Sequence, residues 1–157
     1  MFGYSLRLVK EYERAVIYTL GRYSGVKGPG MIFIIPVIQA VRRIDVRARL
    51  ISVEGDVLSS DNQSLRLSAD VYFQVKAPEK AANSVADYMR AMEELTRTAM
   101  REKSRSRTRG EILDGIENLS SAVCKTMDAA TGEWGITVSN VVLRHPAGAS
   151  IPVNQPA

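Results

Sequence analysis

The sequence has 157 residues, of which 45% are hydrophobic and 24% charged, and this composition argues against wholesale disorder. A chain of this length suits one domain or two small lobes that share a core. No window reaches the roughly 18 consecutive apolar residues of a membrane-spanning helix. The single cysteine, Cys124, excludes an internal disulfide and a cysteine-cluster zinc site, so a reducing compartment is expected.

The stretch GRYSGVKGPGMIFIIPVI, residues 21–38, joins a glycine-rich segment to an apolar run. Its glycines match neither the dinucleotide fingerprint nor the Walker loop, and the residues after Gly30 are strand-like, so no helix N-terminus is available for a phosphate. Residues 31–38 are expected to form a core strand or, at its tip, a shallow membrane contact. The residues predicted to form turns are Gly21, Gly25, Gly28, Pro29 and Gly30.

The rest of the first half also has the pattern of β-strands. Residues 16–20 are rich in strand formers, and apolar residues alternate with polar ones over residues 44–50 and 65–76. Such period-two patterns are the strongest sequence signal for half-buried strands. Residues 60–63, Ser-Asp-Asn-Gln, have the composition of a turn between them. A mostly antiparallel sheet is predicted.

The second half is predicted to be helical and to end in a strand. Pro78 suits a first helical position, Ser84 stands three residues before Asp87 as a weak cap, and Thr108 precedes Glu111 with the spacing of a capping box. An apolar stripe from Ile112 to Ala130 indicates a long helix behind that box, and residues 136–143 form a returning strand. This order of elements predicts an α+β fold.

Catalytic motifs are scarce in the sequence. His145 is the single histidine, no Gly-x-Ser-x-Gly elbow presents a serine, and no cluster of ligands suggests a metal site. The chain is therefore predicted not to be an enzyme, with no catalytic residue, no metal and no cofactor.

Positive charge is concentrated in one segment. Residues 97–109 carry six basic residues and one acid, a net charge of +5, whereas the whole chain has a formal net charge of +4, so the remainder sums to −1. A solvated helix end is the simplest interpretation. Anionic lipid or an acidic partner surface is a functional one, and nucleic-acid binding is the alternative, although no aromatic residue is present to stack on bases.

Several separated blocks of the sequence resemble one known family. Residues 9–17, VKEYERAVI, and 27–30, KGPG, are followed in order by residues 44–47, 60–62 and 69–75 and by EWGITV at 133–138. The chain thereby resembles, over roughly residues 7–143, the stomatin/prohibitin/flotillin domain, also called SPFH or Band 7, and within it the stomatin branch.

This resemblance implies a fold of two lobes, here residues 1–55 and 56–145. Residues 146–157 contain three prolines and no periodic pattern, so a flexible tail is predicted there. It implies a peripheral, membrane-associated scaffold on the reducing, cytoplasmic side that self-assembles and regulates membrane proteins such as channels or proteases. Family members usually carry a hydrophobic segment before this domain and a coiled coil after it; the sequence contains neither, so self-association through domain faces is expected. The apolar run supplies the expected membrane contact, Met31, Ile32, Phe33, Ile34, Ile35 and Val37. The expected contacts to anionic lipid or a partner are Arg97, Arg101, Lys103, Arg105, Arg107 and Arg109.

Overall fold

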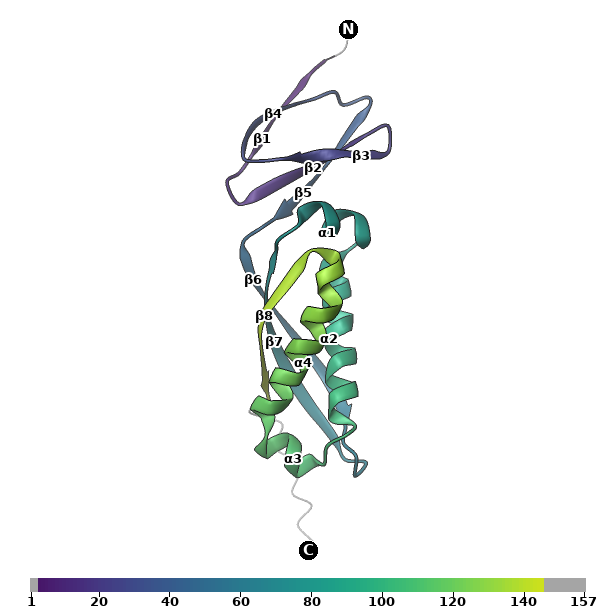
Figure 1. Ribbon diagram of the computed structural model, residues 1–157, viewed down its shortest axis with the longest axis vertical. Helices are drawn as coiled ribbons and strands as arrows, with labels where there is room; N and C mark the ends of the chain where they lie inside the picture. The colour runs from purple at the N-terminus through teal and green to yellow at the C-terminus, as the bar shows by residue number, and fades with distance from the viewer. Residues whose placement is uncertain (1–2, 146–157) are drawn as a thin grey trace, which may run out of the picture. The chain divides into compact units, whose positions relative to one another are not determined.

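The computed structural model describes residues 3–145, so the predicted tail at residues 146–157 lies outside the described part. Strands fill the first half and helices the second, and one strand returns at the end, which confirms the α+β prediction (Figure 1). The elements in chain order are β1 (Ser5–Val9), β2 (Glu13–Thr19), β3 (Arg22–Lys27), β4 (Gly30–Ile34), β5 (Gln39–Asp45), β6 (Ala48–Leu58), β7 (Ser64–Val75), α1 (Pro78–Ser84), α2 (Tyr88–Ser104), α3 (Arg109–Asp114), α4 (Ile116–Thr131), a 3₁₀ turn η1 (Gly132–Trp134) and β8 (Ile136–Arg144).

The described chain divides into two compact units, each assembled from three separate segments. A lobe boundary between residues 55 and 56 stays a prediction. Unit 1 contains residues 3–49, 73–91 and 128–137, and unit 2 contains residues 50–72, 92–127 and 138–145.

Unit 1 contains two small antiparallel sheets, β1–β4 and β3–β2–β5. They share a core in which Val9, Ala15, Ile32 and Ile34 are buried, with Val41 packed against them. Helix α1 is attached to the second sheet by polar contacts. The Tyr18 hydroxyl on β2 donates to the Asn83 side chain (2.6 Å), and the Arg42 guanidinium on β5 donates to the Ala82 carbonyl (2.8 Å) and to the Ala86 carbonyl.

Unit 2 is a two-layer arrangement of helices on the sheet β6–β7–β8. Strand β7 follows the predicted alternation, because its apolar side chains are buried and its polar ones are not. Gly55 on β6 lies so near α2 that a Cβ atom there would be 3.3 Å from Met100 Cε. Thr96 on α2 contacts the Met127 sulfur on α4 at 3.5 Å. The largest fully buried side chains of this unit include Leu67, Met92, Met100, Ile112, Leu119 and Met127.

The prediction of a single strand over residues 44–50 is wrong, since β5 ends at Asp45 and β6 begins at Ala48. Local polar groups satisfy the backbone at this break. The Arg47 N–H donates to the Asp45 carboxylate (2.9 Å), the Val46 N–H donates to the Tyr12 carbonyl (2.9 Å), and the Gln74 amide donates to the Val46 carbonyl (2.9 Å). The apolar residues on the two sides of the break therefore do not share one buried face, since Ile44 is buried but Leu50 is half-exposed.

The long helix predicted behind residue 112 is also interrupted. Gly115 has φ −112° and ψ 36°, which is not helical, and it separates α3 from α4. The predicted capping box is confirmed, since the Thr108 side chain accepts from the Glu111 N–H and the Glu111 carboxylate accepts from the Thr108 N–H. Pro78 begins α1 as predicted.

Candidate functional site

The two-stranded sheet of unit 1 has one apolar face that is open to solvent. Its register pairs Leu6 on β1 with Phe33 on β4, and Leu8 with Met31. These four side chains are 55%, 68%, 65% and 67% exposed, respectively. Directly opposed residues of an antiparallel pair lie within side-chain contact range. Leu6, Leu8, Met31 and Phe33 therefore form a continuous patch, which we call the apolar sheet face.

The opposite face of the same sheet belongs to the core. Ile32 and Ile34 are buried there, so strand alternation removes them from any surface contact. Of the other residues predicted for membrane contact, Ile35 is half-buried and Val37 is exposed. Within the apolar run only Ile32 and Ile34 belong to the core, and the membrane contact, which stays a prediction, is limited to Met31, Phe33 and Val37.

Sequence reasoning missed Leu6 and Leu8. The signal was present, because Leu6-Arg7-Leu8-Val9 alternates like a half-buried strand. Alternation alone assigns the leucines to a core face, however, and only the pairing of β1 with β4 shows that Val9 is buried while Leu6 and Leu8 stay exposed.

Two further exposed apolar residues of unit 1 lie in connections, Leu20 between β2 and β3 and Val37 between β4 and β5. Leu20 occupies the left-handed region with φ 52°, and its N–H donates to the Ile38 carbonyl at 2.7 Å. Leu20 and Val37 are each more than three-quarters exposed. A non-glycine residue with this φ is uncommon, and such positions cluster at functional sites.

The predicted turn glycines fall into two groups. Gly21 forms the β2–β3 turn with φ 78°, and Gly28-Pro29 connect β3 to β4. Gly25 does not form a turn: it lies inside β3 opposite Ile17, where the register with β2 shifts. Gly30 begins β4 rather than preceding it. A glycine inside a strand commonly marks such a bulge.

The basic segment of unit 2 is partly neutralised by acids, two of which precede it in the sequence. Arg97 pairs with Glu94 (2.9 Å) and lies 4.0 Å from Glu93, and Lys103 pairs with Glu102 (3.3 Å). Arg101 and Arg105 are both exposed. These two arginines are therefore the best placed of the predicted cations for an external anion.

The remaining two basic residues of the segment, Arg107 and Arg109, hold the local structure through their backbone groups. The Arg109 N–H donates to the Asp61 carboxylate (3.3 Å), and the Ser60 N–H donates to the Arg107 carbonyl (2.8 Å). The hydroxyl of Ser59, and to a lesser degree the Arg109 N–H, hold the pKa of Asp61 below its ordinary value. The connector between α2 and α3 is thereby fastened to the β6–β7 turn.

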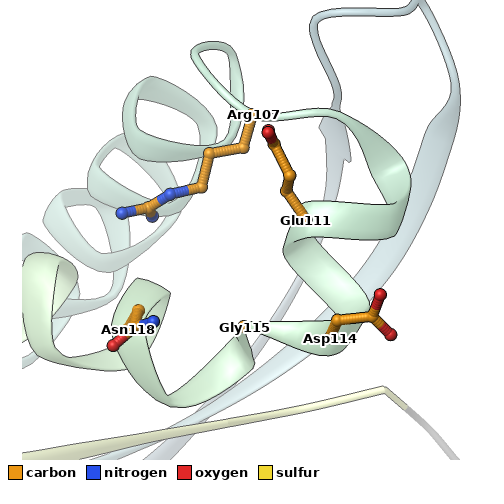
Figure 2. A pocket seen from close by; sticks show the side chains of 5 residues that line it. All are labelled: Arg107, Glu111, Asp114, Gly115 and Asn118. Carbon is orange, nitrogen blue, oxygen red and sulfur yellow. The ribbon is translucent and has the colours of Figure 1, made fainter.

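An open cavity of about 530 Å³ lies where α3 meets α4. Figure 2 shows the Arg107 side chain directed toward α4, above Asn118, while Asp114 points away. Arg107 Nη1 is buried and has no hydrogen-bond partner among the described residues. Arg107 is thus not a freely exposed cation, in contrast to Arg101 and Arg105. The residues that line the cavity are Arg107, Glu111, Asp114, Gly115 and Asn118.

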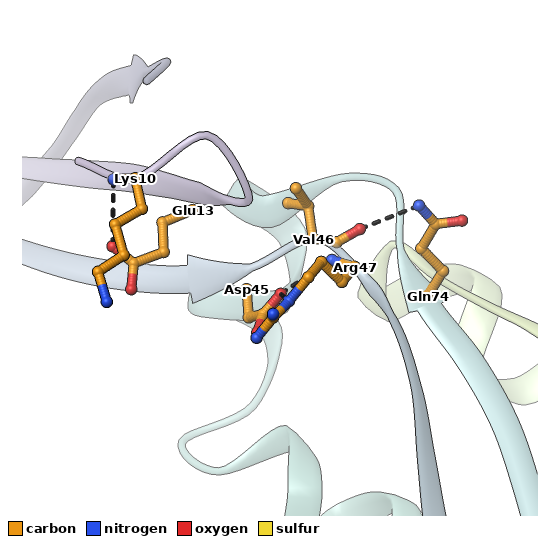
Figure 3. A network of polar contacts seen from close by, with 6 residues as sticks. All are labelled: Lys10, Glu13, Asp45, Val46, Arg47 and Gln74. Atoms are coloured by element: carbon orange, nitrogen blue, oxygen red, sulfur yellow. Dashed lines mark hydrogen bonds and ion pairs between the residues drawn. The ribbon is translucent and has the colours of Figure 1, made fainter. Parts of the chain in front are cut away.

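The break between β5 and β6 carries a compact polar network in unit 1 (Figure 3). The Arg47 guanidinium donates to both oxygens of Asp45, at 2.8 Å for its shortest contact, and stacks 3.9 Å from the centre of the Tyr12 ring. The hydrogen bond from Arg47 holds the pKa of Asp45 below its ordinary value. Such a network fixes the position of the backbone at the break between β5 and β6.

No group of three or more His, Cys, Asp or Glu residues in the described range, 3–145, could hold a metal ion. His145 follows β8 and is half-buried. Within the same range no helix is both long enough and apolar enough to cross a bilayer.

Comparison with known proteins decides the family. The model of the SPFH domain / Band 7 family matches residues 7–149. This chain belongs to that family. The SPFH domain is 36% identical over 148 residues to a stomatin homolog from Pyrococcus horikoshii, covering 92% of this chain and 56% of that relative.

Other relatives come from Caenorhabditis elegans. Stomatin-4 is 34% identical over 144 residues, with 90% of this chain and 51% of that relative covered. Mechanosensory protein 2 is 35% identical over 142 residues, with 88% and 30% covered. The chain spans little more than half the length of the Pyrococcus relative and 30% of the length of Mechanosensory protein 2.

Proposed function

We propose that this SPFH domain is a non-enzymatic, membrane-associated scaffold that attaches peripherally through the apolar sheet face. The observation that carries the proposal is the cross-strand pairing of Leu6 with Phe33 and of Leu8 with Met31, which places four large apolar side chains on one open surface. Exposed apolar patches of this kind mark interaction sites. The lack of a spanning helix in the described residues fits a contact that enters the interface without crossing it.

The strength expected of this contact is modest. Full burial of a large apolar side chain gains about 1.5–3 kcal/mol, and the four side chains would be only partly buried in a headgroup region. One weak apolar anchor gives reversible attachment, and stable attachment needs a second signal. As a separate contact, we propose that Arg101 and Arg105 of unit 2 meet an anionic surface, of lipid or of a sister subunit, with each exposed cation contributing up to about 1 kcal/mol near anionic lipid.

Vesicle flotation tests the apolar contact. The double variant Met31→Ser/Phe33→Ser should bind vesicles of mixed neutral and anionic lipid about tenfold more weakly or worse, since it removes two of the four side chains. Neither side chain is part of the core, so the variant should keep the circular dichroism spectrum of the parent. The matched control is Leu50→Ser/Leu58→Ser, which removes exposed leucines of β6 outside the apolar sheet face. Equal losses of vesicle binding in both variants would show that the apolar sheet face has no special role in this binding.

A second flotation series tests the cations. Arg101→Gln/Arg105→Gln should weaken binding to anionic vesicles at low salt, and the difference from the parent should shrink as salt rises, because exposed charges are screened within about 8 Å at physiological ionic strength. Arg90→Gln, an exposed arginine of α2 outside the basic segment, is the control. An unchanged low-salt affinity would make this segment a solvated face only.

We further propose that the domain self-associates and acts on a client membrane protein such as a channel or protease. The name of one relative, Mechanosensory protein 2, connects that protein to mechanosensation, and a regulator of membrane proteins is the corresponding role for this chain. The nucleic-acid alternative gains no support from the described contacts, because acids from Glu94 to Glu111 are interspersed with the cations it would need.

A further inference from the structure

Positive charge is unevenly divided between the two units. Unit 1 carries twelve basic and seven acidic residues, a net charge of +5, whereas unit 2 carries nine basic and ten acidic residues, a net charge of −1. The basic segment at residues 97–109 is thus outweighed by the acids of its own unit. The unit that carries the apolar sheet face also carries the excess of positive charge, and such an excess attracts anions.

One arginine of unit 1 lies on a strand of the apolar sheet face itself. Arg7 follows Leu6 and precedes Leu8 on β1, and it is exposed. Within residues 3–145 its guanidinium has no ion pair and no hydrogen bond. Three other arginines of unit 1 donate to oxygen atoms of their own unit, namely Arg14, Arg42 and Arg47. The Arg7 guanidinium therefore keeps its donors for an external acceptor.

A cavity of about 160 Å³ lies beside Arg7, between β1, the end of β4 and the start of β5. Its lining contains no carboxylate, and its other polar side chains are Ser5 and Gln39, of which Gln39 already accepts from the Ile35 N–H at 3.0 Å. The volume corresponds to about five water molecules at roughly 30 Å³ each, and a phosphate group has five heavy atoms. An arginine fork matches two phosphate oxygens in one plane. The cavity therefore suits a phosphate group held by Arg7.

The apolar sheet face indicates what carries this phosphate. Side chains alternate along a strand, so Leu6 and Leu8 point to one face of β1 and Arg7 points to the other. An interfacial segment buries its apolar side by about 5–10 Å, to the boundary between headgroups and acyl chains. With the apolar sheet face at that depth, Arg7 lies on the side of the sheet that faces away from the acyl chains, at the level of the headgroups. A lipid supplies both acyl chains for the apolar face and a phosphate for Arg7, whereas a free phosphate supplies only the second.

We propose that the cavity beside Arg7 binds the headgroup phosphate of an anionic phospholipid whose acyl chains contact the apolar sheet face. The inference rests on the membrane attachment proposed above and adds a lipid preference to it. A zwitterionic headgroup such as phosphatidylcholine carries its own cation beside the phosphate, whereas an anionic headgroup leaves the phosphate charge to the protein. A unit of net charge +5 favours the second kind.

Flotation of the full chain onto two kinds of vesicle tests the site. One kind contains phosphatidylcholine alone and the other adds phosphatidylglycerol, and the ratio of the two affinities measures the lipid preference. Arg7→Gln should lower this preference about fivefold, the effect of one cation at an anionic surface, and should leave the affinity for phosphatidylcholine vesicles unchanged. Arg7→Lys keeps the charge without the fork and should keep only part of the preference. The matched control, Arg90→Gln, removes the same charge from another exposed arginine of unit 1 and should leave the preference close to that of the parent.

The outcomes separate this site from the attachment on which it rests. Equal losses in Arg7→Gln and Arg90→Gln would show an effect of net charge alone and would overturn the site, while binding to phosphatidylcholine vesicles would still support the attachment. A parent that binds neither kind of vesicle would overturn both.

NMR of the ¹⁵N-labelled chain identifies the source of the phosphate. We expect soluble short-chain phosphatidylglycerol to shift the Arg7 Nε–H signal at millimolar concentration, and inorganic phosphate at the same concentration to shift it much less, because it makes no contact with the apolar sheet face. Equal shifts with inorganic phosphate would assign the cavity to a free phosphate and would overturn the lipid proposal.

Discussion

At the scale of single residues, two sites depend on a specific backbone conformation or on a specific charge. Gly135, after the turn η1, has φ 69°, and its carbonyl accepts from the N–H groups of Lys76 and Ala77. Asp45 and Arg47 hold the break between β5 and β6. Both sites lie in unit 1 and set where its strands begin or end.

Gly135→Ala should lower the free energy of unfolding by about 2 kcal/mol or more, since the left-handed conformation alone costs about 1–3 kcal/mol for other residues. The added Cβ would also lie 2.6 Å from both the Cβ and the carbonyl oxygen of Ala77. Urea unfolding measures the change. Gly132→Ala is the matched control, because a Cβ there meets nothing within 4 Å. Equal losses in the two variants would contradict this account of Gly135.

Asp45→Asn should destabilise the domain at neutral pH and not in acid. The folded pKa of Asp45 lies below its unfolded value of about 3.9. The stabilisation that the Asp45 carboxylate contributes is therefore fully present above its unfolded pKa and is lost as the pH falls through its folded pKa. Urea unfolding of parent and variant across acidic and neutral pH measures the difference. Glu11→Gln, on an exposed residue, is the control; a difference that persists below the folded pKa would argue against the charge-assisted hydrogen bond from Arg47 as its source.

At the scale of helices and strands, caps and glycines decide the boundaries. The Asp87 carboxylate accepts from the N–H groups of Met89 and Arg90 and so caps α2. The sequence pattern suggests Ser84 as the cap instead of Asp87. The box of Thr108 and Glu111 begins α3, and Gly115 ends it. These local contacts set helix boundaries among the four α-helices, α1 to α4, of the described residues.

Thr108→Ala should cost about 1 kcal/mol of stability, the usual effect of losing an N-cap side chain. The loss should be concentrated in α3, so the amide of Glu111, which donates to the Thr108 hydroxyl, should exchange faster. Hydrogen exchange followed by NMR measures this locally. Thr108→Ser keeps the hydroxyl and should behave like the parent; if it behaved like alanine, the methyl group and not the cap would be the cause.

At the scale of the whole molecule, the surfaces offered for self-association are small. Strand β7 lies in the middle of its sheet, between β6 and β8, so its backbone edges are not available to a sister subunit. In that sheet, as far as the structure describes the chain, the outer strands are β6 and β8, and the Leu143 N–H of β8 donates to the Ser120 hydroxyl of α4. The apolar sheet face consists of only four side chains. Four side chains do not supply the roughly 1,200 Å² of buried surface that a stable interface needs.

The chain should accordingly form monomers or loose small oligomers in dilute solution and assemble further only on a membrane or at high concentration. Sedimentation velocity across a hundredfold dilution should show a sedimentation coefficient that falls with dilution or stays at the monomer value. Repeating the measurement with Met31→Ser/Phe33→Ser separates association through the apolar sheet face from other modes. A large ring that persists at every concentration without lipid would refute the prediction.

The sequence by itself determined the features that depend on neighbouring residues. Alternation placed β7, the Thr108–Glu111 spacing placed the start of α3, and Pro78 placed the start of α1, because each signal acts within a few residues. Tertiary structure alone decided which strands pair and which faces they expose. Leu6 and Ile32 are equally apolar, and only the pairing of β1 with β4 leaves the first exposed while the core buries the second. The burial of such residues depends on partners that are distant in the chain, so no local sequence pattern predicts it.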